Sequence, residues 1–192
     1  SSVQSLGGVV RYLDTLNDLD RPQDAYEVAL KAVRVLPAEQ SLWDRAENIA
    51  RQITSAEPLA DMYEAVLRNP ENGLERVEAI ELGQRAVAFY EEWYEDSERV
   101  VRVLERLLEI DPDETWSFDR LKLIFDAKER WDDLFSLYDR AAASADKERR
   151  LELLEEAAQI AKDFANHAQR AIRYFEQLLE LKPGNARLSS SL

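Results

Sequence analysis

Three segments of this 192-residue chain align without a gap over 18 residues, and each segment ends in a proline. Their sequences are DRPQDAYEVALKAVRVLP, EDSERVVRVLERLLEIDP and NHAQRAIRYFEQLLELKP, which end at Pro37, Pro112 and Pro183. Apolar residues stand 12, 8 and 5 positions before each proline, and this spacing keeps them on one face of an α-helix. Each proline should end its helix, because it has no backbone N–H to donate and restricts the residue before it. The chain therefore repeats an amphipathic helix followed by a stop signal.

A second apolar pattern follows each of the first two prolines. Aromatic residues stand six and 26 positions further on: Trp43 and Tyr63 after the first proline, Phe118 and Tyr138 after the second. We expect a short turn between the two aromatics of each pair. The repeating unit is therefore a helical hairpin.

The positions of these aromatics, with the alanines and prolines of the aligned segments, resemble the tetratricopeptide repeat, a 34-residue pair of helices. The resemblance covers about residues 6–186. Where the family places a small residue on its first helix, this chain carries Glu47 and Lys122. The resemblance implies a stack of hairpins whose first helices line a concave side, where ligands of the family often lie.

The expected fold is all-α: a right-handed α-solenoid of about five antiparallel hairpins in one continuous array over residues 1–192. Such an array is stabilised by contacts between neighbouring hairpins, because one hairpin cannot bury both of its faces. The hairpins are expected at about 6–39, 40–73, 74–114, 115–147 and 148–186, and residues 187–192 as the truncated start of a further helix or a tail. These last residues are too few to cover the final hairpin, so we expect either a piece of a longer array or end-to-end self-association.

Composition narrows the range of partners. Thirty-nine acidic residues against 25 lysines and arginines give a net charge of −14, which disfavours nucleic acid and anionic membrane surfaces as partners. The chain has no cysteine, so it can form neither a disulfide nor a Cys-ligated metal site. No apolar run approaches the roughly 20 residues of a membrane-spanning helix.

Motifs that would indicate catalysis are missing from the sequence. It contains no HExxH, P-loop or GxGxxG pattern and a single histidine, His167. With so many carboxylates, a close pair of them carries little information about acid–base catalysis. We therefore expect no enzyme activity, cofactor or metal, and keep a helical hydrolase or metal enzyme as a remote alternative.

The resemblance places a set of candidate partner-binding residues on the concave side: Asp14, Asp44, Asn48, Trp116, Asp119 and Leu123. Family members that hold chaperone C-termini use a clamp of Lys, Asn and Arg at such positions. Only Asn48 fits that clamp, so a basic or mixed apolar protein segment suits these residues better than a chaperone tail.

An acidic-aromatic stretch, YEEWYEDSE at 90–98, is a second candidate surface. Its proposed docking residues are Tyr90, Glu91, Trp93, Tyr94 and Glu95. They form either a solvated helix end or a patch whose rings grip the side chains of a basic peptide. The expected function is a non-catalytic scaffold that binds another protein or peptide, and the alternative is a structural or oligomerisation segment with an empty groove.

Overall fold

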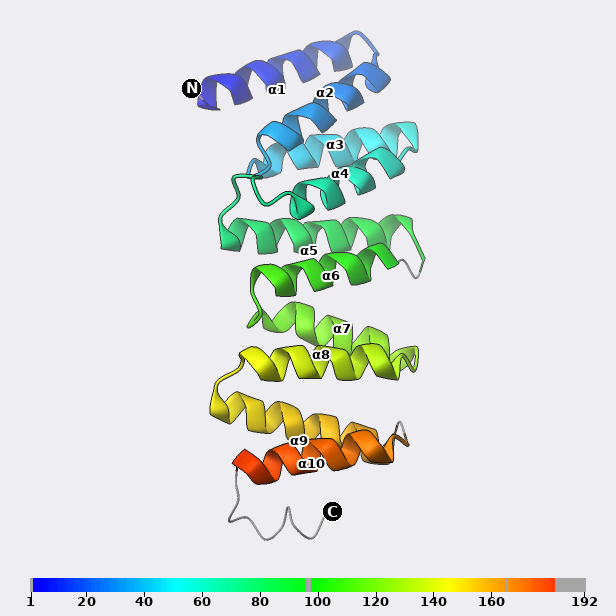
Figure 1. Cartoon of the computed structure of the whole chain (residues 1–192). Coiled ribbons are helices and arrows are strands. Elements are labelled where there is room, and N and C mark those ends of the chain that lie inside the picture. Colours follow the sequence, from blue (N-terminus) through cyan, green and yellow to red (C-terminus); the bar gives the residue numbers. More distant parts are fainter. Residues whose placement is uncertain (1, 96–97, 165, 182–192) are drawn as a thin grey trace. The chain divides into compact units, whose positions relative to one another are not determined.

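The computed structural model describes residues 2–95, 98–164 and 166–181, and every regular element within these ranges is an α-helix. The chain divides into two compact units, Ser1–Ile110 (unit 1) and Asp111–Leu192 (unit 2). Figure 1 shows that the helices of each unit follow one another in chain order. Among the described residues, no helix has the length and apolar character needed to cross a membrane.

Unit 1 consists of three helical hairpins. Their helices are α1 (Ser2–Asp18), α2 (Pro22–Val35), α3 (Gln40–Ile53), α4 (Glu57–Arg68), α5 (Arg76–Trp93) and α6 (Glu98–Ile110). Each helix contacts the next one along the chain, and the second helices of the hairpins also contact one another, α2 with α4 and α4 with α6. The second helices therefore form a layer of their own within this unit.

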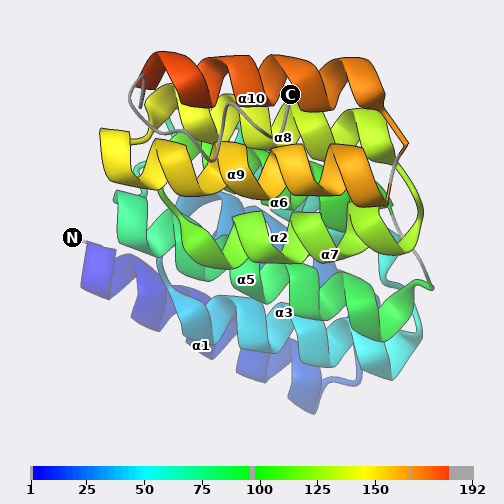
Figure 2. The ribbon, with the colours of Figure 1, turned by 90° about the horizontal axis from the view of Figure 1, so that it is seen from below.

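Unit 2 contains two hairpins, formed by α7 (Thr115–Ala127), α8 (Trp131–Ser144), α9 (Lys147–Asp163) and α10 (Ala168–Leu181). Helix α9 packs against both α8 and α10, and Figure 2 shows α9 alongside α10. The predicted all-α fold of antiparallel helical hairpins is confirmed for the described residues. The single continuous array over residues 1–192 stays a prediction, and residues 187–192 lie outside the described part of the chain.

Prolines follow two of the helix ends at the same distance. Helix α2 ends at Val35, two residues before Pro37, and α6 ends at Ile110, two residues before Pro112. The third aligned proline, Pro183, lies outside the described residues. These ends agree with the inability of proline to continue a helix.

The turns inside four of the hairpins share a backbone conformation. One residue in each turn has a positive φ of 51–54°: Asp20, Thr54, Glu129 and Asn166. In three of these turns the following N–H donates to a carbonyl five residues earlier, at 2.8–2.9 Å: Arg21 to Leu16, Ser55 to Ala50 and Arg130 to Phe125. This arrangement satisfies carbonyls at a helix end that would otherwise lack a donor.

Aromatic side chains from the two helices of a hairpin meet in the core. In unit 1 the rings of Trp43 and Tyr63 stack with their centroids 4.3 Å apart, and the indole N–H of Trp43 donates to the Pro37 carbonyl at 2.9 Å. In unit 2 the equivalent rings of Phe118 and Tyr138 meet edge to face at 5.4 Å. The aromatic pairs named from the sequence therefore join the first and second helices of these two hairpins.

Gly83 marks a close approach of two helices in unit 1. It lies buried on α5, and a Cβ atom added to it would come 2.8 Å from Cγ of Leu107 on α6. Leu107 is itself fully buried, so its side chain could make room only by shifting within the core. The glycine therefore allows α5 and α6 to pack closely at this point.

Candidate functional site

The candidate carboxylates of unit 1 are held by arginines of neighbouring helices. Asp14 on α1 accepts a hydrogen bond from Arg45 on α3 at 2.7 Å. Asp44 on α3 pairs in the same way with Arg85 on α5. Because each carboxylate already has a cation, neither is an open site for a lysine or arginine of a partner.

Arg85 is the centre of a larger network between α3, α4 and α5. Its Nε atom donates to Glu47 at 2.9 Å and to the Tyr63 hydroxyl at 3.1 Å, and its Nη1 atom donates to Gln40 at 3.1 Å. The Tyr63 hydroxyl in turn donates to Glu47. Burial, together with the Glu47 carboxylate, raises the pKa of Tyr63 above its ordinary value.

Unit 2 carries the corresponding network with its charges exchanged. Tyr138 donates to Glu156 on α9 at 2.8 Å, and Lys122 on α7 lies 4.0 Å from the same carboxylate. Lys122 aligns with Glu47 and Glu156 aligns with Arg85 in the repeat. Glu47 and Lys122 stand where the tetratricopeptide pattern has a small residue. In each unit this residue therefore makes the charged contact with the next first helix.

Two of the candidate residues line one cavity of about 260 Å³ in unit 1, formed by α1, α2 and α3: Asp14 and Asn48. The amide oxygen of Asn48 accepts a hydrogen bond from Arg51 at 3.2 Å. Asp20, Arg21 and Arg45 also line the cavity, so its lining has equal numbers of acidic and basic side chains.

The remaining candidates share one face of α7 in unit 2. Trp116, Asp119 and Leu123 follow one another at intervals of three and four residues, which places them on the same side of a helix. Glu114 fixes the start of this helix, since its carboxylate accepts hydrogen bonds from the N–H groups of Trp116 and Ser117 at 2.9 and 2.6 Å.

The α7 face is exposed, and its carboxylate is paired more loosely than the candidate carboxylates of unit 1. The Leu123 side chain is 64% exposed and the Asp119 side chain 62% exposed, whereas Trp116 is half-buried. Asp119 lies 3.9 Å from Lys122, beyond hydrogen-bonding distance. The face therefore combines apolar surface with a carboxylate that is not tightly paired.

The acidic-aromatic stretch does not present all of its rings to solvent. Tyr90 is fully buried, and its hydroxyl donates to the Ala60 carbonyl at 2.9 Å. Tyr94 donates to Glu57 at 2.8 Å. Trp93 is half-buried, and its indole N–H is enclosed without a hydrogen-bond partner among the described residues. Glu91 and Glu95 are exposed.

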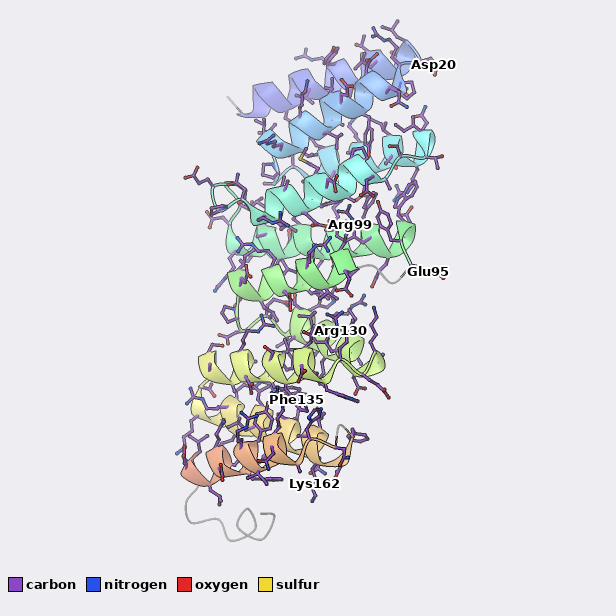
Figure 3. The ribbon with its side chains drawn as sticks, turned by 45° about the vertical axis from the view of Figure 1, so that its right-hand side comes forward. Asp20, Glu95, Arg99, Arg130, Phe135 and Lys162 are labelled. Carbon is purple, nitrogen blue, oxygen red and sulfur yellow. The ribbon has the colours of Figure 1, made fainter. Side chains whose placement is uncertain are left out.

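Sequence reasoning missed the arginines that neutralise the acidic helices of unit 1. Arg99 on α6, labelled in Figure 3, contacts three carboxylates of α4, at Glu57, Asp61 and Glu64. Arg51 on α3 donates two hydrogen bonds to Glu92 on α5, at 2.7 and 2.8 Å. These links join residues 35–42 positions apart in the sequence, so no local pattern indicates them.

No group of three or more His, Asp or Glu side chains suited to a metal ion occurs within the part of the chain that the structure describes. His167 lies instead against Phe135, with ring centroids 5.6 Å apart.

No family model and no curated protein matches the chain. Among solved structures it is similar to YrrB, described as a TPR protein with an unusual peptide-binding site, at 13% sequence identity and a TM-score of 0.37. The match covers 95% of this chain and 89% of that one. A similarity of this size assigns no partner to the present chain.

Proposed function

We propose that this chain is a non-catalytic scaffold that binds a segment of another protein, and that the α7 face formed by Trp116, Asp119 and Leu123 is the binding surface. The observation that carries the proposal is the exposure of Leu123 beside a carboxylate held only loosely by its neighbour. Exposed Leu123 and half-buried Trp116 offer apolar area to a partner, and tryptophan is enriched among the residues that dominate binding energy.

The chemistry of the α7 face favours a segment that carries both an apolar and a basic residue. Leu123 and the ring of Trp116 offer apolar area, while Asp119 offers a carboxylate to a lysine or arginine. The guanidinium of Arg120 lies 5.7 Å from the centre of the Trp116 ring, a cation–π contact that helps to hold the indole in place.

Selection of binders from a random peptide library displayed on phage, with the purified chain as bait, tests this proposal. Selected peptides should contain a basic and an apolar residue, and Asp119→Lys or Leu123→Ala should weaken their binding at least fivefold. Matched controls are Glu27→Lys on α2 and Leu19→Ala, both at exposed positions. Peptides that bind the Asp119→Lys, Leu123→Ala double variant as tightly as the original chain would reject the α7 face.

A structural or oligomerisation segment is the second candidate, and the outer side of α10 favours it. Ile172 is 39% exposed, and Phe175 and Leu179 on the same face are half-buried. Self-association through this face would appear in sedimentation velocity as a concentration-dependent dimer that Ile172→Glu abolishes. A chain that stays monomeric at high concentration would reject this candidate and leave the scaffold proposal standing.

A further inference from the structure

We propose that a cavity between α8, α9 and α10 binds a carboxylate of an acidic peptide segment, with Arg173 as its principal contact. The cavity measures about 470 Å³, within the range of small-ligand sites. Its lining comes from the second half of α8, the start of α9 and much of α10. None of the residues of the α7 face lines it, so this inference is independent of the proposed function.

The charge of the cavity is opposite to that of the chain. Three arginines, Arg150, Arg170 and Arg173, line it together with one acidic residue, Asp139. The cavity of α1, α2 and α3 described above has equal numbers of acidic and basic residues. So does a third cavity of about 360 Å³ on α4 and α6. In a chain with a net charge of −14, an excess of arginine around one cavity indicates an anionic ligand.

Two of the arginines are held in place by the protein itself. Arg150 donates from Nε to the Ala142 carbonyl at 2.8 Å and from Nη2 to the Ala145 carbonyl at 3.0 Å, both near the C-terminal end of α8. Arg170 contacts Asp132 at 3.2 Å, and its guanidinium lies 5.0 Å from the centre of the Phe135 ring. Phe135 is labelled in Figure 3. These contacts order the cationic wall before a ligand arrives.

Arg173 differs from the other two arginines in having no such contacts. It is exposed on α10, and among the described residues it forms no hydrogen bond or ion pair. The nearby carboxylate, Asp139, is already engaged, since it accepts a hydrogen bond from Tyr174 at 2.8 Å and lies 3.9 Å from Arg170. The guanidinium of Arg173 is therefore available to an incoming anion.

A carboxylate suits this cavity better than a phosphate. The planar fork of arginine binds a carboxylate or a phosphate through two parallel hydrogen bonds, so the difference between the two anions lies in their charge. A phosphate dianion would place about twice the charge of a single carboxylate in the cavity beside Asp139 and would meet stronger repulsion from it. Leu154 and Ala142 add buried apolar surface to the wall, which can contact the methylene groups of a glutamate or an adjacent apolar residue. These features favour a peptide segment over a free inorganic anion.

Titration calorimetry and NMR with a defined probe, the blocked peptide acetyl-Ala-Glu-Leu-Glu-Ala-amide, test this inference. We expect binding that weakens about tenfold in Arg173→Gln, as for loss of hydrogen bonds to a charged group, and less in Arg173→Lys. The side-chain Nε–H resonance of Arg173 should shift on addition of the peptide. Circular dichroism of each variant verifies that the helices are retained.

The matched control is Arg34→Gln, which removes the same charge from an exposed arginine of α2. It should leave the affinity unchanged, and the peptide with both glutamates replaced by glutamine should not bind. Equal affinity of Arg173→Gln and the original chain, or an equal loss in Arg34→Gln, would overturn the inference. Tighter binding of the same peptide with phosphoserine in place of glutamate would overturn the preference for a carboxylate.

Discussion

The Nε atom of Arg85 on α5 lies 2.9 Å from a carboxylate oxygen of Glu47 on α3, in a part of unit 1 where both side chains are mostly buried. Only 12% of the Glu47 side chain and 19% of the Arg85 side chain are exposed. The tetratricopeptide pattern, which the sequence resembles, has a small residue where Glu47 stands. Here that position links successive first helices through charge, and in unit 2 the link between Lys122 and Glu156 has the opposite polarity. In each unit the charge on one first helix is therefore complementary to the charge on the next first helix.

Replacement of Glu47 by glutamine should destabilise the chain by about 2 kcal/mol, because a partly buried guanidinium and a tyrosine hydroxyl lose their charged acceptor. Urea unfolding followed by circular dichroism measures the change. Glu27→Gln on α2, at an exposed position without an ion pair among the described residues, is the control and should change stability by less than about 0.5 kcal/mol. Equal stability of the two variants would show that the Glu47 link contributes nothing.

The repeat pattern in the sequence predicts the helices well, because each helix carries its own apolar face and its own stop. Pro37 and Pro112 follow the ends of α2 and α6, and Trp43 meets Tyr63 as the spacing indicates. The close contact at Gly83 was not predictable, because it depends on how near α6 comes to α5. No period along one helix encodes that distance.

Substitution of Gly83 by alanine should lower stability by about 1 kcal/mol. Alanine favours the helix by about 1 kcal/mol, but an added methyl group in a filled core costs about 1–3 kcal/mol, and the Leu107 side chain that it would meet is fully buried. The control is Gly8→Ala on α1, where an added Cβ meets no atom within 4 Å. Thermal unfolding should show a lower midpoint for Gly83→Ala and a higher one for Gly8→Ala; a higher midpoint for both would refute the packing argument.

Thr54 adopts a backbone conformation that disfavours β-branched residues. Its φ of 53° lies in the left-handed region, which costs a non-glycine residue about 1–2 kcal/mol. Thr54→Gly should therefore stabilise the chain by about 0.5–1 kcal/mol after the entropy of glycine in the unfolded state is subtracted. Ser55→Gly, the adjacent control, should be destabilising by about 0.5 kcal/mol, because Ser55 is not among the residues with a positive φ. Urea unfolding measures the stability of both variants. A loss of stability in Thr54→Gly would contradict the inference that the backbone at Thr54 is strained.

The candidate site was less predictable than the helices. The sequence contains carboxylates at Asp14, Asp44 and Asp119. Only the structure shows that Asp14 and Asp44 face an arginine and that Asp119 does not. The pairing depends on residues about 30–40 positions away, such as Arg45 and Arg85. The acidic neighbours of Tyr90 indicate a surface position, whereas its ring is buried between α4 and α5.

Alkaline pH should unfold the chain through its buried tyrosines. Burial raises the pKa of Tyr26 to about 12, and burial also raises the pKa of Tyr63, Tyr90 and Tyr138. An unfolded tyrosine ionises near pH 10, so above that pH the unfolded state has lost a proton that the folded state still holds. Stability is therefore intact below about pH 10 and falls as the pH rises from about 10 to 12, by about 1.4 kcal/mol per pH unit for each such tyrosine.

The measurement is a parallel titration of tyrosinate absorbance at 295 nm and helical circular dichroism at 222 nm. The two signals should change together for the buried tyrosines, because these groups ionise only when the helices open. Tyr26→Phe removes one linked group, and its stability should fall less steeply with pH than that of the original chain. Complete ionisation near pH 10 with the helical signal unchanged would mean that these hydroxyls reach solvent in the folded protein, which their packing against Ser55, Glu47 and Ala60 does not allow.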